Sequence, residues 1–256
     1  MLLPSWLSEG EFSAAKRRLQ DPATHRQIRN EMLGQLKANG WKDYAFARIA
    51  YYKSDPSLVG LNIAEVTQKR EAELHASHAS VIPSKFAAEG KDVTESERQA
   101  ETVMDLFSHG GAQMVFFDMS EDDVETILKA PEVMFGSDSS VREENVAVLP
   151  HPRGMGTFPR ILGVYVREKN LLSVEEAIRR MTSLPATTFG LTDRGLIREN
   201  NWADLVIFDR AKILDTATFE KPLSLPEGIR YVIVNGSIVL DQENLTKSLP
   251  GMALRH

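Results

Sequence analysis

A predicted helix between two short apolar segments places the strongest constraint on the fold of this chain. Residues 112–117 and 133–135 are apolar, and Ser120 with Asp123 three residues later marks a helix start between them. Two strands joined by a helix within about 25 residues form a βαβ unit, in which the strands pair in parallel. The middle of the chain is therefore predicted to be α/β.

The first hundred residues are dominated by helix signals. Asp21 followed by Pro22 is typical of an N-cap with proline at the first helical position. Ile28, Met32 and Leu36 then recur at the spacing of one helix face. We expect a strand over residues 44–51, a helix over 63–73 and a loop or irregular insertion over 75–92.

Two capping boxes mark later helices. Thr94 is followed three residues later by Glu97, and Ser173 by Glu176. In such a box the hydroxyl and the carboxylate each accept a hydrogen bond from a free backbone N–H group of the first turn. Helices are predicted to start at both positions.

The last fifty or so residues have an all-β character. Residues 203–209 and 229–240 each contain an apolar run typical of a strand, and Asn235-Gly236 interrupts the second run. Asn-Gly between apolar runs is the strongest short signal for a two-residue hairpin turn. A small antiparallel sheet is therefore predicted at this end of the chain.

Composition narrows the class of protein. The 256 residues carry a net charge of −6, and the densest basic cluster, around Lys16, lies on helical patterns, so nucleic-acid binding is not expected. No cysteine is present, which excludes disulfides and thiolate ligands from this chain. The sequence has no apolar run of about 18 residues and no signal-peptide pattern, so we expect no membrane association and a cytoplasmic location.

Asp138 is the first candidate for chemistry. It follows the apolar segment 133–135 and Gly136, at the start of a polar loop. A carboxylate at the end of a barrel strand can bind a metal or move a proton between water and a leaving amine. Spacing alone favours the alternative that Gly-Ser-Asp-Ser-Ser is a simple turn, because these residues favour turns for local backbone reasons.

A second unusual segment, residues 151–160, is predicted to be a substrate-binding loop. Gly154 and Gly156 allow the backbone to approach a ligand, and Arg153 or Arg160 can hold a carboxylate with two parallel hydrogen bonds. The alternative is that each arginine pairs with a structural acid.

The histidines indicate less. His75 and His78 have a spacing that can present two metal ligands on a helix face, or they are surface residues. His109 suits the C-terminal end of a helix, where a cation is favourable. Glycine-rich phosphate loops and the Gly-x-Ser-x-Gly nucleophile motif are absent from the sequence.

Several motifs in order resemble the D-aminoacylase (N-acyl-D-amino-acid deacylase) family of amidohydrolases. The resemblance covers essentially the whole chain and is most specific between Gly136 and Gly236. The matching stretches are Gly136-Ser-Asp138, His151-Pro-Arg153, Gly156-Thr-Phe-Pro-Arg160-x-Leu-Gly163-x-Tyr165-x-Arg167-Glu168, Met181-Thr182-x-x-Pro185-Ala186, Asp193-Arg-Gly195, Ala203-Asp-Leu-Val206 and Val232-x-Val234-Asn235-Gly236.

The resemblance implies an α/β fold that is the C-terminal portion of a metal-dependent (β/α)8 barrel, with an inserted helical segment and a share of a small β domain. Residues 1–110 would be the segment inserted before the last barrel strand. Residues 111–200 would hold the end of the barrel, with 133–135 as its last strand and the catalytic Asp loop. Residues 201–256 would belong to the small β-sandwich domain.

The resemblance also implies an activity. Family members hydrolyse the amide of N-acyl-D-amino acids, and a zinc ion polarises the carbonyl and activates water. By its position Asp138 would be the proton-handling residue and a weak ligand of a second metal. Arg153 would hold the substrate carboxylate, and Met119 would line the acyl or side-chain pocket.

This chain departs from the family at the metal site. The family's zinc ligands, a cysteine and two histidines, are expected upstream of the part resembled here. We therefore expect the chain to act with an N-terminal half, in cis or in trans, and Met1 to be an internal start in a split, truncated or mis-called gene. Two alternatives remain open: a non-catalytic remnant or partner-binding half of an amidohydrolase, and a different amidohydrolase of the dihydroorotase or hydantoinase type.

Overall fold

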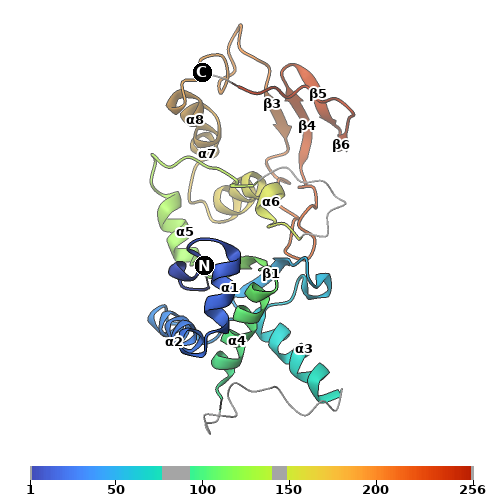
Figure 1. The fold of residues 1–256 in the computed structure, drawn as a ribbon. Helices are drawn as coiled ribbons and strands as arrows, with labels where there is room; N and C mark the ends of the chain where they lie inside the picture. The colour runs from blue at the N-terminus through green and yellow to red at the C-terminus, as the bar shows by residue number, and fades with distance from the viewer. Residues whose placement is uncertain (1, 77–92, 140–148, 255–256) are drawn as a thin grey trace. The chain divides into compact units, whose positions relative to one another are not determined.

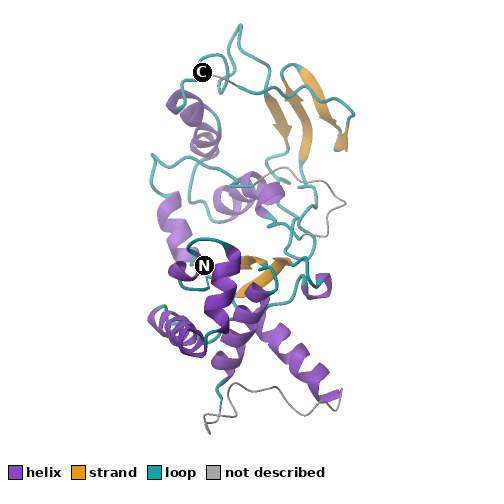
Figure 2. Cartoon of the chain, viewed as in Figure 1, coloured by secondary structure: helices purple, strands orange, loops and turns teal. Residues whose placement is uncertain are grey.

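The computed structural model describes residues 2–76, 93–139 and 149–254 (Figure 1). The chain divides into two compact units, one formed by residues 1–118 with 147–149 and the other by 119–146 with 150–256. Each unit combines helices with antiparallel strands, as Figure 2 shows. The three-part division predicted from the sequence stays a prediction.

The first unit is mainly helical and contains one two-stranded sheet. Its elements, in chain order, are the 3-10 helix η1 Ser5–Ser8, α1 Phe12–Gln20, α2 Pro22–Ala38, β1 Ala47–Tyr51, the 3-10 helix η2 Pro56–Leu58, α3 Ile63–Ala76, α4 Glu95–Ser108 and β2 Gln113–Phe116.

The start of α2 confirms the sequence signal. The Asp21 carboxylate accepts a hydrogen bond from the Thr24 N–H group at 2.8 Å, and Pro22 occupies the first helical position. Ile28, Met32 and Leu36 are all buried in the core of this unit. Each such side chain contributes about 1.5–3 kcal/mol by leaving water, so α2 is held mainly by its apolar face.

The pairing of β2 differs from the prediction. β2 pairs antiparallel with β1, with Ala47 opposite Phe116. The predicted strand over residues 133–135 is wrong, because this segment lies outside the strands of the described structure. Its backbone groups bond instead to Arg180: the guanidinium donates to the Val133 carbonyl, and the Phe135 N–H group donates to the Arg180 carbonyl. The parallel βαβ unit is therefore not formed.

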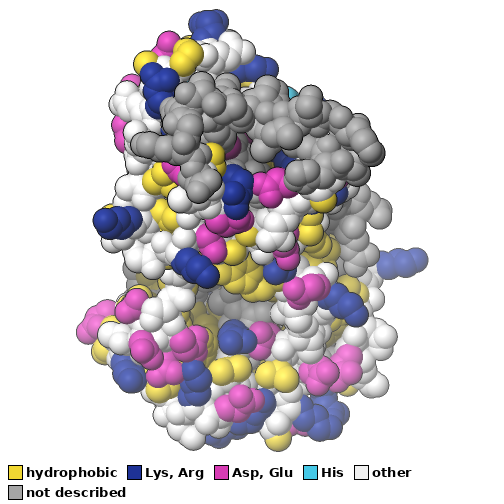
Figure 3. All heavy atoms as spheres, turned by 90° about the horizontal axis from the view of Figure 1, so that it is seen from below, with side chains coloured by type: hydrophobic (Ala, Val, Ile, Leu, Met, Phe, Trp, Pro, Cys, Tyr) yellow, Lys and Arg dark blue, Asp and Glu magenta, His cyan; other side chains and the backbone are white. Residues whose placement is uncertain are grey.

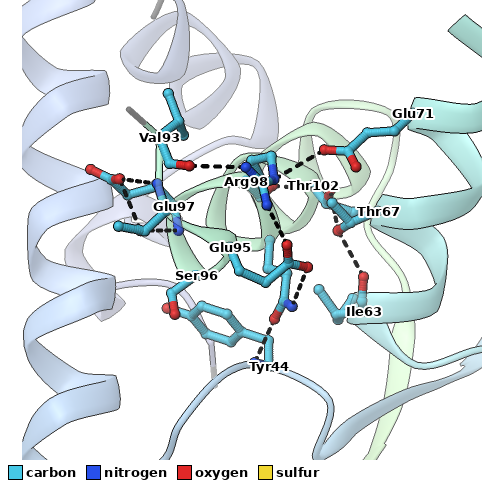
Figure 4. Close-up of polar contacts among 12 residues, drawn as sticks. Tyr44, Ile63, Thr67, Glu71, Val93, Glu95, Ser96, Glu97, Arg98 and Thr102 are labelled. Atoms are coloured by element: carbon cyan, nitrogen blue, oxygen red, sulfur yellow. Dashed lines mark hydrogen bonds and ion pairs between the residues drawn. The ribbon is translucent and has the colours of Figure 1, made fainter. Parts of the chain in front are cut away.

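The start of helix α4 confirms the first predicted capping box. Side chains of α4 also make hydrogen bonds and ion pairs with neighbouring segments (Figure 4). Arg98 contacts Glu71 of α3 at 3.1 Å, and the Thr67 and Thr102 hydroxyls lie 2.8 Å apart between the same helices. The buried Gln99 accepts a hydrogen bond from the Tyr44 N–H group at 2.7 Å. These contacts join α4 to α3 and to the chain that leads into β1.

The second unit contains five helices in its described part. These are α5 Glu121–Leu128, α6 Arg153–Arg160, the π-helix η3 Ile161–Glu168, α7 Val174–Met181 and α8 Ser183–Thr188. At the start of α7 the Ser173 hydroxyl accepts from the Glu176 N–H group, but the Glu176 carboxylate turns to Arg179. The predicted helix start is confirmed, whereas the reciprocal half of the capping box is not made.

The predicted substrate loop over residues 151–160 is wrong as a description of the backbone, since α6 occupies most of it. Close packing requires glycine at Gly163 in η3, where a Cβ would lie 2.6 Å from the Ile213 carbonyl oxygen. A Cβ on Gly156 would lie 3.4 Å from the Asp215 side chain, which is an ordinary van der Waals distance. Gly163 therefore lets η3 lie against the backbone of residues 213 and 214.

The second unit ends in a four-stranded antiparallel sheet, which confirms the predicted all-β character of this part of the chain. Its strands in order are β3 Leu205–Phe208, β4 Ile229–Val234, β5 Ser237–Asp241 and β6 Asn244–Leu245. Asn235 and Gly236 have φ values of 48° and 80°, the left-handed pair that a two-residue hairpin requires. The predicted turn between β4 and β5 is confirmed.

The molecular surface carries charges of both signs. On the face shown in Figure 3, Lys and Arg side chains of the described residues lie among Asp and Glu side chains. Within the part of the chain that the structure describes, every helix is too short or too polar to cross a membrane.

The Gln99–Tyr44 hydrogen bond is expected to be important for the stability of the first unit. In Gln99→Leu the Tyr44 N–H group stays buried but loses its acceptor, which costs about 1–3 kcal/mol. Denaturant unfolding followed by the fluorescence of Trp6 and Trp41 measures this loss. The control is Gln27→Leu, which removes an exposed side-chain contact and is expected to change stability by less than about 0.5 kcal/mol. Equal stabilities for the two variants would contradict the assigned role.

Candidate active site

Asp138 lies in an exposed turn of the second unit. Its φ is 47°, and its side chain is 88% exposed. Asp tolerates this left-handed conformation better than most residues, and the surrounding residues 133–139 form neither helix nor strand. The exposed carboxylate is also accessible to a small molecule, so the turn and the catalytic interpretations are compatible.

The structure brings Asp138 together with Arg153, the other main residue predicted from the sequence. The Arg153 Nη2 atom lies 2.8 Å from Asp138 Oδ2. Arg153 is the first residue of α6, and Gly154 follows it. A Cβ on Gly154 would lie 2.7 Å from the Ser139 hydroxyl, so the missing side chain allows the Asp138 turn to approach this end of α6.

His151 fixes the backbone at the start of α6. The Arg153 N–H group donates a hydrogen bond to His151 Nδ1 at 3.0 Å, which satisfies one of the free donors of the first turn. Because Nδ1 is the acceptor, the neutral ring carries its proton on Nε2. The ring also makes an edge contact with Phe219, at 5.0 Å between centroids.

The environment of His151 disfavours its protonated form. Burial of the ring lowers the pKa of His151 below its ordinary value, and the nearby Arg153 charge lowers this pKa further. The acceptor at Nδ1 is therefore retained at neutral pH. Sequence reasoning noted His151 only as part of a motif; a possible signal was its position two residues before the first residue of a helix.

Arg160 and Met119 are not joined to this pair in the described contacts. Arg160 contacts Asp215 at 3.2 Å, which confirms the structural-acid alternative for this arginine. Met119 lies just before Ser120, the N-cap of α5, and is 74% exposed. Its predicted role in a pocket stays a prediction.

The remaining histidines do not form a metal site in the described structure. His78 and the side chain of His75 lie outside the described residues. His109 is the C-cap of α4, as expected, and its Nδ1 lies 3.3 Å from Asp105 Oδ1. Across residues 2–76, 93–139 and 149–254 there is no group of three His, Cys, Asp or Glu side chains that could hold a metal ion. Asp138, paired with an arginine, does not fit a zinc site with these residues.

The ion pair can serve two chemical purposes. A carboxylate can accept a proton and return it, and a guanidinium can hold a carboxylate through a pair of hydrogen bonds. In this structure the carboxylate that Arg153 holds belongs to Asp138. Both groups are partly open to solvent, so a ligand carboxylate can compete for the same guanidinium.

Comparisons with known proteins show what this chain is similar to. A model described as the amidohydrolase family matches residues 62–240. An N-acyl-D-aspartate deacylase from Alcaligenes xylosoxydans xylosoxydans is 44% identical over 143 residues, which are 56% of this chain and 28% of that protein.

Solved structures give similar matches. A D-aminoacylase, studied for the functional role of its binuclear metal centre, has a TM-score of 0.62 and 35% identity. An N-acyl-D-glutamate deacylase from Bordetella bronchiseptica, complexed with zinc and a phosphonate mimic of the tetrahedral intermediate, has a TM-score of 0.58 and 34% identity. The matches cover 79% and 77% of this chain but only 36% and 35% of the solved chains. The chain thus spans little more than a third of these relatives.

His151 is expected to make stability depend on pH. Its pKa is lowered in the folded state, so the unfolded chain binds its proton more readily; the stability present above about pH 6.5 is lost as the pH falls through the folded pKa. Imidazole titration by NMR should give a folded pKa below about 6.5 with the neutral proton on Nε2. Replacement His151→Asn, which keeps a side-chain acceptor, should remove this part of the pH dependence. A ring protonated on Nδ1 in the neutral state would disprove the capping role.

Proposed function

The chain belongs to the amidohydrolase family, and from this premise we propose that it takes part in the hydrolysis of N-acyl-D-amino acids. In this reaction water attacks the acyl carbon, the C–N bond breaks, and a carboxylate and a free D-amino acid are released. The named activities of the similar deacylases support this substrate class. Because the chain spans little more than a third of the solved relatives, the activity is assigned to a longer or two-part enzyme.

The ion pair between Asp138 and Arg153 is the observation that carries the proposal. The two residues lie 15 positions apart, on a turn and at a helix start, yet their side chains meet at 2.8 Å. A group that moves protons and a group that holds the substrate carboxylate are both needed close to the scissile amide. Asp138 and Arg153 supply these two groups side by side at an exposed position.

The proposed role of Asp138 is proton transfer. Its carboxylate would accept a proton from the attacking water and return it to the nitrogen of the leaving amine. Its exposed carboxylate can be reached by substrate and water. The backbone of Asp138 has a positive φ, a conformation that few residues other than glycine adopt readily.

The proposed role of Arg153 is to hold the substrate carboxylate. A guanidinium has five N–H donors, so it can bind a second carboxylate without losing all contact with the first. Substrate binding would then draw Arg153 partly away from Asp138 and leave the aspartate oxygen available for the proton. We also propose that Met119 lines the acyl or side-chain pocket, as the family resemblance implies.

Zinc enters this proposal only as a group held by other parts of the enzyme. The similar solved proteins are metal-dependent, and one of them was studied with zinc. The described residues of this chain do not fit a zinc site, and the sequence has no cysteine. We propose that the principal metal ligands come from an N-terminal half, in cis or in trans. Residues 1–110 would be an insertion, 111–200 the end of the barrel with the Asp loop, and 201–256 part of a β domain.

Removal of the Asp138 carboxylate is the direct test. The 256-residue chain is combined with a matching N-terminal half, and release of D-amino acid is assayed. Asp138→Asn is expected to lower kcat by roughly 10²–10⁴-fold, the usual contribution of a positioned general base or acid. The matched control is Asp241→Asn, at an exposed position of β5, which should retain wild-type kcat. Wild-type kcat in Asp138→Asn would remove its assigned role, and hydrolysis of a dihydropyrimidine or hydantoin instead would indicate a different amidohydrolase.

Arg153 is tested by changing both the enzyme and the substrate. Arg153→Met should raise KM for an N-acyl-D-amino acid by roughly 10–100-fold, because a hydrogen bond to a charged group contributes about 1.5–3 kcal/mol. The same substitution should have little effect on the KM of the corresponding amide, which has no carboxylate. Arg210→Met, at an exposed position, is the control. An equal rise for both substrates would show that Arg153 does not hold the carboxylate.

A further inference from the structure

Two adjacent arginines of α7 have very different surroundings. Arg179 is partly exposed and pairs with Glu176 at 2.7 Å. The side chain of Arg180 is completely buried, and it is the largest fully buried side chain of the described structure. A buried guanidinium is costly because it loses its hydration, so its contacts need a specific explanation.

The contacts of Arg180 converge on one segment. Its Nε atom donates to the Val133 carbonyl at 2.5 Å, and Nη1 donates to the Leu128 carbonyl at 2.6 Å. The guanidinium carbon lies 4.3 Å from the centre of the Phe135 ring, a cation–π contact. The Phe135 N–H group donates in return to the Arg180 carbonyl at 3.3 Å. One residue therefore binds the segment 128–135 at three positions.

Charge neutralisation does not explain this arrangement. Within the described residues the Arg180 guanidinium makes no ion pair with a carboxylate, and its buried Nη2 atom has no hydrogen-bond partner. Burial lowers the pKa of Arg180, and the charges of Glu176 and Glu132 only partly oppose this effect. An apolar side chain of similar volume would fill the space at lower cost. What the arginine provides is a set of rigid donors for backbone carbonyls that lie outside any strand.

The bound segment leads directly to the candidate active site. Only Gly136 and Ser137 separate Phe135 from Asp138. The Asp138 carboxylate itself forms the ion pair with Arg153. The segment that Arg180 binds is therefore the fixed base from which the Asp138 turn projects.

We propose that Arg180 is a positioning residue that fixes the Asp138 turn through the carbonyls of Leu128 and Val133 and the ring of Phe135. This inference rests on the proposed function of Asp138. Arg180 does not touch the substrate in this proposal. It limits the positions that the Asp138 carboxylate can adopt, which matters because misplacement by about 1 Å can cost roughly 100-fold in rate.

Hydrogen exchange on the 256-residue chain tests the structural half of the proposal. Arg180→Met should raise exchange in residues 128–138 at least about tenfold, while strands β4 and β5 keep wild-type protection. Arg180→Lys retains one charged donor and should give an intermediate value. The matched control is Arg194→Met, since Arg194 is also largely buried but stacks on Trp202 and pairs with Asp204. Unchanged exchange in 128–138, or equal loss of protection throughout the second unit, would overturn the proposal.

A double-mutant cycle in the assembled enzyme tests the catalytic half. Arg180→Lys should lower kcat by roughly 10–100-fold with KM nearly unchanged, and it should have no further effect once Asp138 is replaced by Asn. A purely structural role predicts instead that the two losses multiply, and that result would overturn the inference. If the wild-type assembly releases no D-amino acid, the proposed function fails and the positioning role fails with it. If the assembly is active but the kcat losses of the two substitutions multiply, only the positioning role of Arg180 fails.

Discussion

Within each unit, side chains hydrogen-bond to main-chain groups at the places where helices and strands end. Arg180 supplies donors to the Leu128 and Val133 carbonyls, and Arg167 donates to the Ile213 carbonyl at 2.6 Å. In the first unit, Gln99 accepts from the Tyr44 N–H group. Buried backbone groups must be paired wherever a strand or helix does not pair them. The loops of this chain are therefore fixed by a few long side chains, and the candidate active site depends on one such loop.

Local signals in the sequence were sufficient for several elements. The Asp21-Pro22 helix start, the Thr94 capping box and the Asn235-Gly236 hairpin depend on contacts within a few residues, and all three are confirmed. Two predictions failed because they depend on distant partners. Residues 133–135 have strand-like composition, but a strand needs a neighbouring strand, and here an arginine takes that place. Residues 151–160 resemble a loop because of their glycines, whereas the chain is helical from Arg153 and the missing side chain of Gly154 leaves room for Ser139.

The sequence was sufficient to select the residues of the candidate site, but not to predict how they are arranged. Asp138 and Arg153 could each be selected for their chemistry and their glycine neighbours. Their contact could not be predicted, because it depends on how α6 lies against the 138–139 turn, through the absent side chain of Gly154. Arg180 gave still less signal, since an arginine in the last turn of a helix is normally an exposed residue that complements the helix dipole. Arg180 differs from Arg179 in being buried, and sequence periodicity predicts burial only coarsely.

If Asp138 has its proposed role, its left-handed backbone makes the requirements of stability differ from those of chemistry. For a residue with a Cβ atom this conformation costs about 1–2 kcal/mol, and glycine would adopt it without that cost. A chain selected only to fold well would thus gain from losing the carboxylate at this turn. Under the proposed function, copies of the protein no longer required for activity would gain stability from glycine here. The residue at this position in related chains would then indicate whether the carboxylate is still used.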